Sequence, residues 1–277
     1  MSRTPASERV YAVRRPFAAF FAGAAVGLLG GLIGLGGAEF RLPLLIAVFE
    51  LYPQRAIRIN LLISLATLAV AGAARLSFVQ VASIAEFKSE IVGMLAGGTI
   101  AAWFGAVLLT RIPKGCMVAI IGALLVAISA LLVIETLLQG TLQLALPHGA
   151  AVRLPAAVAV GVVVGMVSSL LGVAGGELII PILVFVFGAD IKTAGTLSIL
   201  ISAPIVLVGI ARHVLTRHFR SRSMLAYLVL PMSVGSAVGA LAGGYAAAWV
   251  PGDTLRMVLA AILAVSAVKL MWPSAKN

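Results

Sequence analysis

Gly34-Leu-Gly-Gly-Ala-Glu-Phe-Arg-Leu-Pro43 is a glycine-rich segment that returns later in the chain as Gly172-Val-Ala-Gly-Gly-Glu-Leu-Ile-Ile-Pro181. Glu39 and Glu177 are 138 positions apart (177 minus 39), and the two prolines have the same separation. The offset also pairs, without a gap, Gly34 with Gly172, Ala56 with Ala194, Ser64 with Ser202, Gly97 with Gly235, Gly105 with Gly243, and Pro113 with Pro251. Chance similarity of apolar sequence would not align Gly, Glu and Pro together, so we predict two copies of one unit.

The composition is that of a membrane protein. Of the 277 residues, 62% are hydrophobic and only 10% are charged, which leaves too little polar surface for a soluble domain of this length. Apolar segments recur from Phe17 to Trp272, and several approach the ~20 residues that a helix needs to cross the hydrocarbon core. They lack the alternation of apolar and polar residues that transmembrane β-barrels show. We therefore predict an all-α polytopic membrane protein.

The expected organisation follows the repeat. A cytoplasmic N-terminal segment over 1–16 precedes a first repeat over 17–137, a linker over 138–153, a second repeat over 154–272 and a C-terminal tail over 273–277. The expected helices are 17–35, 38–50, 54–74, 88–110 and 114–137 in the first repeat, and 154–173, 177–187, 192–212, 223–249 and 252–272 in the second.

The direction of the second repeat depends on the number of membrane crossings, since an odd number per repeat turns the second copy upside down. If the glycines only kink one span, the copies are parallel; if 17–35 and 38–50 cross separately, the copies are inverted. Basic residues favour inversion, because equivalent loops are biased in opposite directions: Arg55 and Arg58 against Lys192, and Lys88 against Arg217, Arg220 and Arg222. We expect inverted repeats in the bacterial inner membrane, with both termini in the cytoplasm.

The formal net charge of +11 fits this topology, because basic residues in cytoplasmic loops face anionic lipid. Nucleic acid is not an expected partner, since no basic stripe is interleaved with aromatic residues. Cys116 is the only cysteine, which excludes an intrachain disulfide and a cysteine metal cluster.

Each glycine-rich segment is expected to break its helix, with Gly34, Pro43, Gly172 and Pro181 as the break residues, because Gly relaxes the backbone and Pro lacks an N–H donor. Broken backbone at membrane depth persists only where protein buries it or where it lines a wet cavity. A helix that restarts after the break directs free N–H groups and a positive dipole end into that cavity, which suits an anion. The alternative is that the glycines simply allow close helix packing.

Glu39 and Glu177 are the acids of the two breaks. A carboxylate near the bilayer centre costs at least ~2.5 kcal/mol, which indicates a functional role. The pair could couple transport to protons or cap the restarted helices, and the two roles are compatible. Arg41, opposite Ile179 in the other copy, could pair with Glu39, coordinate the anion or extend to the membrane interface.

Polar side chains at helical spacing follow each break. They could hydrogen-bond the oxygens of an anion or a neighbouring helix, because a spacing of three or four residues puts them on one face. The candidate substrate-binding residues are Gly36, Gly37, Arg41, Asn60, Ser64, Gly175, Gly176, Thr196, Ser198 and Ser202.

These motifs resemble the sulfite exporter TauE/SafE family of membrane permeases. The resemblance lies in the two glycine-rich segments and in the Ala-x3-Asn/Ser-x3-Ser helix after each, formed by Ala56, Asn60 and Ser64 and by Ala194, Ser198 and Ser202. It covers nearly the whole chain and implies transport of sulfite, sulfonates and related sulfur-containing anions. The chain departs from the common pattern at Glu39 and Glu177, where many members carry an apolar residue, and at Ala38 and Ala174, where a further Gly is often found.

The expected function is a secondary transporter of a small anion: sulfite, an organosulfonate, or a related sulfur-containing or carboxylate anion, with proton coupling as one option. A passive anion channel and a non-transporting assembly subunit stay open as alternatives. An enzyme is not expected, because Ser168 and Ser169 have no membrane histidine to activate them. No cofactor or metal is expected. The expected partners are the substrate anion and the lipid bilayer, and a homodimer is left open.

Overall fold

Every regular element that the structure describes is a helix. The computed structural model describes residues 15–34, 36–49, 51, 53–76, 81–108, 126, 129–130, 133–134, 146–147, 149–171, 173–215 and 224–271. The elements are α1 (Pro16–Ile33), α2 (Ala38–Ala47), α3 (Pro53–Leu76), α4 (Val81–Glu86), α5 (Lys88–Leu108), α7 (Ala150–Leu171), α8 (Gly176–Phe185), α9 (Ile191–Leu215), the π-helix η1 (Leu225–Val229), α11 (Leu230–Trp249) and α12 (Gly252–Met271).

Within the described residues, five helical segments are long and apolar enough to cross a membrane. They are Pro16–Ile33, Arg55–Arg75, Ala151–Ser169, Ile191–Arg212 and Leu225–Trp249. The predicted all-α, multi-pass class is therefore confirmed. The expected helices have counterparts within a few residues, except that 114–137 lies almost entirely outside the described residues. The sequence did not predict the short helix α4 or the π-helical turn that opens α11.

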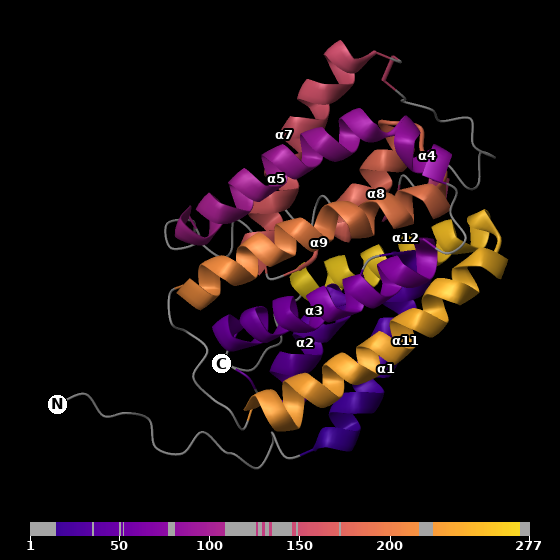
Figure 1. Ribbon diagram of the computed structural model, residues 1–277. Coiled ribbons are helices and arrows are strands. Elements are labelled where there is room, and N and C mark those ends of the chain that lie inside the picture. Colours follow the sequence, from indigo (N-terminus) through magenta and orange to yellow (C-terminus); the bar gives the residue numbers. More distant parts are fainter. Residues whose placement is uncertain are drawn as a thin grey trace.

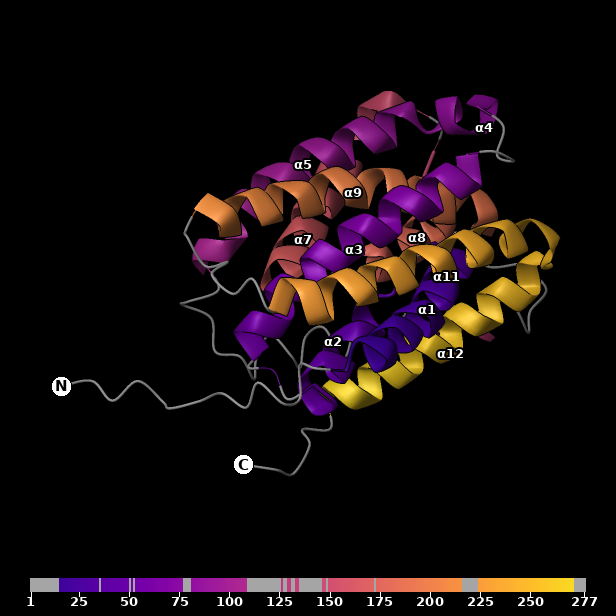
Figure 2. The same cartoon turned by 60° about the horizontal axis from the view of Figure 1, so that its bottom comes forward.

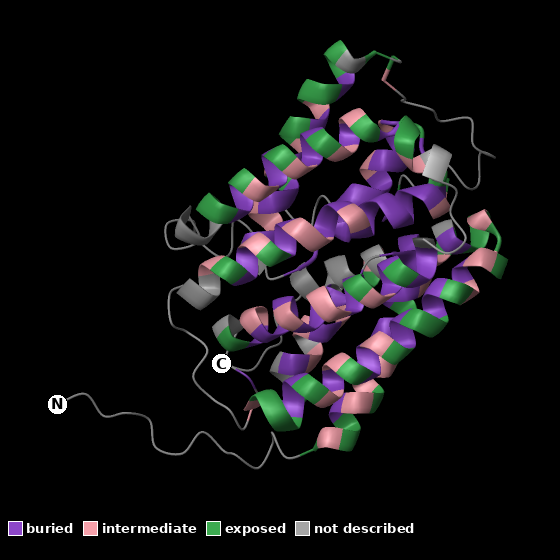
Figure 3. Ribbon diagram, viewed as in Figure 1, coloured by how far each residue is buried: buried purple, intermediate pink, exposed green. Residues whose placement is uncertain are grey.

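The helices form layers, with the short helix α8 at the centre (Figure 1; Figure 2). Helices α3, α8 and α9 lie in the middle, with α5 and α7 on one side and α1, α11 and α12 on the other (Figure 1; Figure 2). Helix α8 is apolar on all its faces apart from Glu177, and nearly all of its residues are buried, as a helix surrounded by protein requires (Figure 3).

The outer helices carry exposed apolar side chains that contact lipid in a bilayer. Phe17 and Phe21 on α1, Val238 on α11 and Ile100 on α5 are exposed in the isolated chain. Exposed residues alternate with buried ones along these helices, so that each presents one face outward (Figure 3). In water such surface would drive association, whereas in a membrane it is the normal outer face.

The outer helices pack in two reciprocal pairs, α1 with α11 and α5 with α7. A β-carbon on Gly27 would lie 2.2 Å from the carbonyl oxygen of Ser236, and one on Gly165 would lie 2.2 Å from that of Gly98. Both contacts need glycine because the backbones approach too closely for a side chain. Gly165 follows Gly27 by 138 positions, and Ser236 follows Gly98 by 138, so the contacts are equivalent under the sequence offset.

The central helices α3 and α9 run antiparallel through the middle of the protein (Figure 1). A β-carbon on Gly72 would lie 3.2 Å from Cγ2 of Ile199, and Arg75 lies beside Gly195, so residue numbers rise on one helix as they fall on the other. The apolar cluster between them contains Leu61, Leu68 and Ala71 of α3, Ile199, Val206 and Ile210 of α9, and Ala174 and Ala240. Leu61 and Ile199 are an offset pair, as are Leu68 and Val206.

Candidate functional site

Both glycine-rich segments interrupt a helix. Helix α1 ends at Ile33, and Gly34, Gly36 and Gly37 take positive φ angles of 97°, 80° and 70° before α2 begins at Ala38. In the second segment Gly175 has a φ of 79°, and α8 begins at Gly176. Side chains with a β-carbon rarely adopt this left-handed conformation, which explains the glycines.

The two breaks contact each other in the interior. A β-carbon on Gly36 would lie 3.6 Å from the Cβ of Ala174 and 3.0 Å from Cδ2 of Leu68. Gly36 and Ala174 are themselves 138 positions apart, so this contact joins two residues that the sequence offset pairs. Gly34 packs on α9, where its β-carbon would lie 2.5 Å from the carbonyl oxygen of Gly195. The N-terminal ends of α2 and α8 are therefore brought to one region.

The prolines lie inside α2 and α8, not in the breaks. Pro43 and Pro181 are each the sixth residue of their helix, so naming them as break residues was wrong. The positive φ angles of the glycines end the preceding helix, and the new helix has already formed when the proline is reached. Gly34 is a break residue as predicted, and Gly172 lies outside the described residues.

Arg41 is fully buried and donates several hydrogen bonds to uncharged oxygens. Its Nη1 donates to Ser64 Oγ (3.0 Å) and Asn60 Oδ1 (3.4 Å). Its Nη2 donates to Thr67 Oγ1 (3.1 Å), to the carbonyl oxygen of Gly36 (3.2 Å) and to Ser236 Oγ (3.3 Å). The guanidinium thus links the break, α3 and α11, and it does not extend to the membrane interface.

Asn60 also ties α3 directly to the start of α2. Its Nδ2 donates to the carbonyl oxygen of Ala38 (2.8 Å). Asn60 and Ser64, predicted from their spacing, therefore lie together with Arg41 beside the first break. Thr67, which extends the same face of α3 by three residues, was not predicted from the sequence. Ser236 was not predicted either, because its offset partner Gly98 has no polar side chain.

At the offset positions, α9 keeps the hydroxyls, but position 179 on α8 is Ile where α2 has Arg41. Ser198 and Ser202 are fully buried, and their Oγ atoms have no hydrogen-bond partner among the described residues. Thr196 donates to the carbonyl oxygen of Lys192 (3.1 Å) in its own helix, so its hydroxyl is engaged locally. Glu177 is buried at 7% exposure in the first turn of α8, where the positive end of the helix favours a carboxylate. Glu39 is the second residue of α2, as Glu177 is of α8.

A second buried arginine, Arg75, closes the end of α1 next to the first break. Its Nε donates to the carbonyl oxygen of Gly31 (3.1 Å), its Nη2 to that of Leu32, and its Nη1 to that of Lys192 (3.3 Å). A cation at a helix C-terminus satisfies carbonyls that have no partner within the helix and interacts favourably with the dipole. Arg75 was not predicted as a buried residue, because an arginine at the end of an apolar segment is typical of the membrane interface.

A family model, sulfite exporter TauE/SafE, matches residues 19–272. The chain belongs to the sulfite exporter TauE/SafE family. It is a multi-pass membrane protein of a transporter family for sulfur-containing anions, as the glycine-rich motifs indicated. No curated protein and no solved structure matches the chain.

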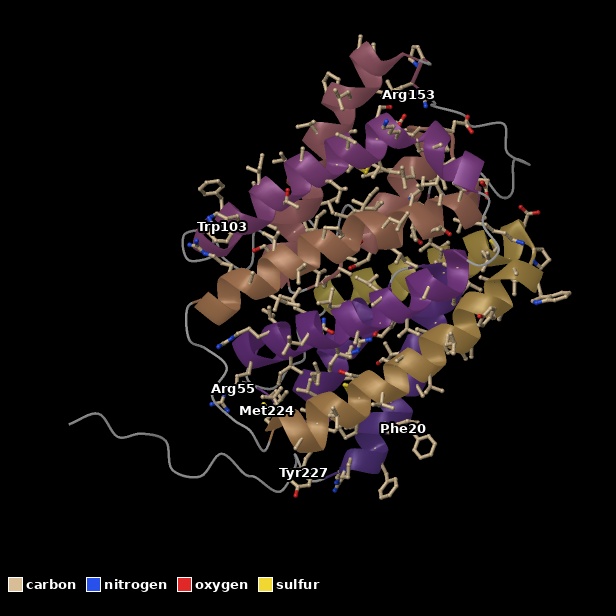
Figure 4. All side chains as sticks on the ribbon, in the orientation of Figure 1. Phe20, Arg55, Trp103, Arg153, Met224 and Tyr227 are labelled. Atoms are coloured by element: carbon tan, nitrogen blue, oxygen red, sulfur yellow. The ribbon has the colours of Figure 1, made fainter. Side chains whose placement is uncertain are left out.

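In this TauE/SafE protein, a buried ion pair lies away from the breaks at the start of α5 and α7. Arg153, labelled in Figure 4, donates from Nη1 to Glu90 Oε1 (3.0 Å). Both side chains are buried. Arg153 also donates to the carbonyl oxygens of Leu146 (3.2 Å) and Phe187 (3.3 Å), which lie before α7 and after α8. The pair joins the first repeat to the linker and the second repeat.

The region around the breaks of this TauE/SafE protein has the chemistry of an anion site. Two helix N-terminal ends, a buried guanidinium and two buried hydroxyls lie on the elements that meet there. Helix ends and a guanidinium favour negative charge, and hydroxyls donate to oxyanions. The described candidate side chains are fully buried apart from Glu177, so the structure shows this region closed to water.

Proposed function

We propose that this protein is a secondary transporter that moves a small sulfur-containing oxyanion, sulfite or an organosulfonate, across the bacterial inner membrane. The contact between Gly36 and Ala174 carries the proposal, because it brings the two broken helices to one buried place. An anion there is attracted by the N-terminal ends of α2 and α8 and by Arg41. Discontinuous helices meeting inside the membrane are the usual binding architecture of secondary transporters.

The proposal includes inverted repeats. Its support is the antiparallel course of α3 and α9, which cover equivalent segments of the two copies. If equivalent helices run in opposite directions, the axis relating the copies lies across them, in the plane of the membrane. The reciprocal packing of α1 on α11 and of α7 on α5 agrees with such an axis.

Proton coupling through Glu39 and Glu177 completes the mechanism. Each is the second residue of a helix that starts at a break. A carboxylate that takes up a proton removes one negative charge from the neighbourhood of the anion, so proton and anion binding favour each other. Rocking of the repeats around the site would then expose proton and anion first to one side and then to the other.

Flux into proteoliposomes tests the function. Purified protein should take up sulfite or sulfoacetate in preference to acetate, with a rate that saturates and that rises in an imposed pH gradient. Flux that never saturates and ignores the pH gradient would indicate a passive channel instead. Failure to move any of these anions, with folded protein in the membrane, would favour an assembly subunit.

A further inference from the structure

Ser198 and Ser202 place two hydroxyl groups of α9 in the interior of the protein. Both residues are fully buried, and their Oγ atoms have no hydrogen-bond partner among the described residues. A buried hydroxyl without a partner costs about 1–3 kcal/mol, so its retention calls for an explanation. Two of them, four residues apart on one helix, occupy one face of α9.

Their position on α9 is fixed by the apolar residues around them. On one side, Ile201 and Ile205 pack in the cluster that contains Leu178 and Ile179 of α8. On the other side, Ile199 and Val206 pack in the cluster that contains Ala174 of the second break. At 100° per residue, Ser198 and Ser202 fall between these two faces. The hydroxyls therefore lie where α8, the second break and α3 converge.

The equivalent side chains of the first copy are already engaged. Asn60 accepts from Arg41 and donates to the carbonyl oxygen of Ala38, and Ser64 accepts from Arg41. Position 179 of the second copy is Ile instead of Arg, so Ser198 and Ser202 face no guanidinium at the equivalent place. Asn60 and Ser64 are therefore engaged within the protein, whereas the hydroxyls of Ser198 and Ser202 are available to bind a ligand.

We propose that the two copies divide the recognition of the transported oxyanion. The first copy supplies a fixed positive charge, Arg41, which Asn60, Ser64 and Thr67 hold in place. The second copy supplies the hydrogen-bond donors, because the hydroxyls of Ser198 and Ser202 bind the oxygens of the anion. This inference rests on the proposed transport function and names its ligand-contacting side chains.

Serine-to-alanine substitutions at offset positions of α3 and α9 test whether Ser198 and Ser202, and not Ser64, bind the anion. Ser202→Ala and Ser198→Ala should each raise the KM for sulfite flux about tenfold, as expected for a lost hydrogen bond to a charged ligand. Without sulfite, the Tm of each variant should equal or exceed that of the wild type, because a buried hydroxyl without a partner is removed. Ser64→Ala should lower the Tm of the purified protein, because a buried acceptor of Arg41 is lost. Ser129→Ala serves as a control outside the breaks, since its hydroxyl bonds the carbonyl oxygen of Ala260.

Wild-type flux separates this inference from the proposed function. If the wild type transports no sulfur anion, the function itself fails. If the wild type transports sulfite but Ser198→Ala and Ser202→Ala keep its KM, the function stands and the division is overturned. The division is also overturned if these variants change only the dependence of flux on sodium, since the hydroxyls would then serve a cation. Sulfite-induced thermal stabilisation, absent in both variants and present in Ser129→Ala, is expected as a second readout.

Discussion

Gly36 and Ala174, which are 138 positions apart in the sequence, meet in the interior: a β-carbon on Gly36 would lie 3.6 Å from the Cβ of Ala174. A residue can meet its own equivalent only next to the axis that relates the copies. If the two halves are inverted repeats, as we propose, the two helix breaks lie next to that axis, together with the apolar cluster between α3 and α9. Motion of one copy against the other would change this region first, as alternating access requires.

Removal of the break acids should uncouple transport from protons. We expect the double variant Glu39→Gln/Glu177→Gln to lose pH-driven flux, because a neutral amide cannot bind and release a proton. Expression and Tm should stay close to those of the wild type. Flux at several imposed pH gradients provides the measurement, and an unaltered response of the double variant would discard the coupling role.

The glycine of the first break should not tolerate a β-carbon. Gly34→Ala forces alanine to a φ of 97° and against the backbone of Gly195, at a cost of about 1–3 kcal/mol from the backbone conformation alone. Gly209 in α9 is the matched control, because no atom lies within 4 Å of its β-carbon position. Gly209→Ala should raise stability by about 0.5–1 kcal/mol through helix propensity. Thermal unfolding in detergent compares the two, and equal Tm values would contradict the close contact with Gly195.

The Tm and the sulfite flux should depend on the guanidinium of Arg41 and not only on its positive charge. Lysine has one ammonium group and cannot bond Ser64 and Thr67 with separate planar donors, so Arg41→Lys should lower both Tm and the sulfite flux. Arg41→Met should abolish flux, because the fixed positive charge is gone. Arg55, an exposed residue at the start of α3, is the control, and Arg55→Lys should behave as the wild type (Figure 4). Normal flux in Arg41→Met would exclude a role of this charge in binding.

Loss of one partner of the Arg153–Glu90 ion pair should destabilise the protein more than loss of both partners. Arg153→Met alone leaves the Glu90 carboxylate buried at 1% exposure, and we expect a loss of about 3–5 kcal/mol. The double variant Arg153→Met/Glu90→Leu should recover much of that loss, since no buried charge remains. A double-mutant cycle on thermal stability measures the coupling, and strictly additive effects would show that the pair is not coupled.

Cysteine labelling can decide the orientation of the repeats. Lys88 and Ala226 are an offset pair, and both are exposed near the starts of α5 and η1. In a Cys116→Ala background, Lys88→Cys and Ala226→Cys should react with a membrane-impermeant maleimide from opposite sides of the membrane. Labelling of both from one side would show parallel repeats.

The sequence by itself determined the membrane class, the two glycine breaks and the residues around them. Composition alone requires lipid-facing helices, since 62% hydrophobic residues cannot be covered by 10% charged ones. The glycine-rich segments also predicted the breaks, because glycine commonly ends a helix. The positive φ angles of Gly34, Gly36, Gly37 and Gly175 agree with that prediction. The spacing of Asn60 and Ser64 placed both on one helix face, and Arg41 binds both.

Only the tertiary structure decided which polar groups are engaged and which are available. Contacts such as Arg41 with Ser236, 195 positions apart, depend on how α11 packs on α3, and no local pattern encodes that. The polar residues have the same spacing in α3 and α9, but Arg41 bonds Ser64, whereas the hydroxyls of Ser198 and Ser202 have no partner among the described residues. The reason is physical: helix periodicity fixes the face on which a side chain lies, whereas the neighbour on that face is set by the long-range packing of the other helices.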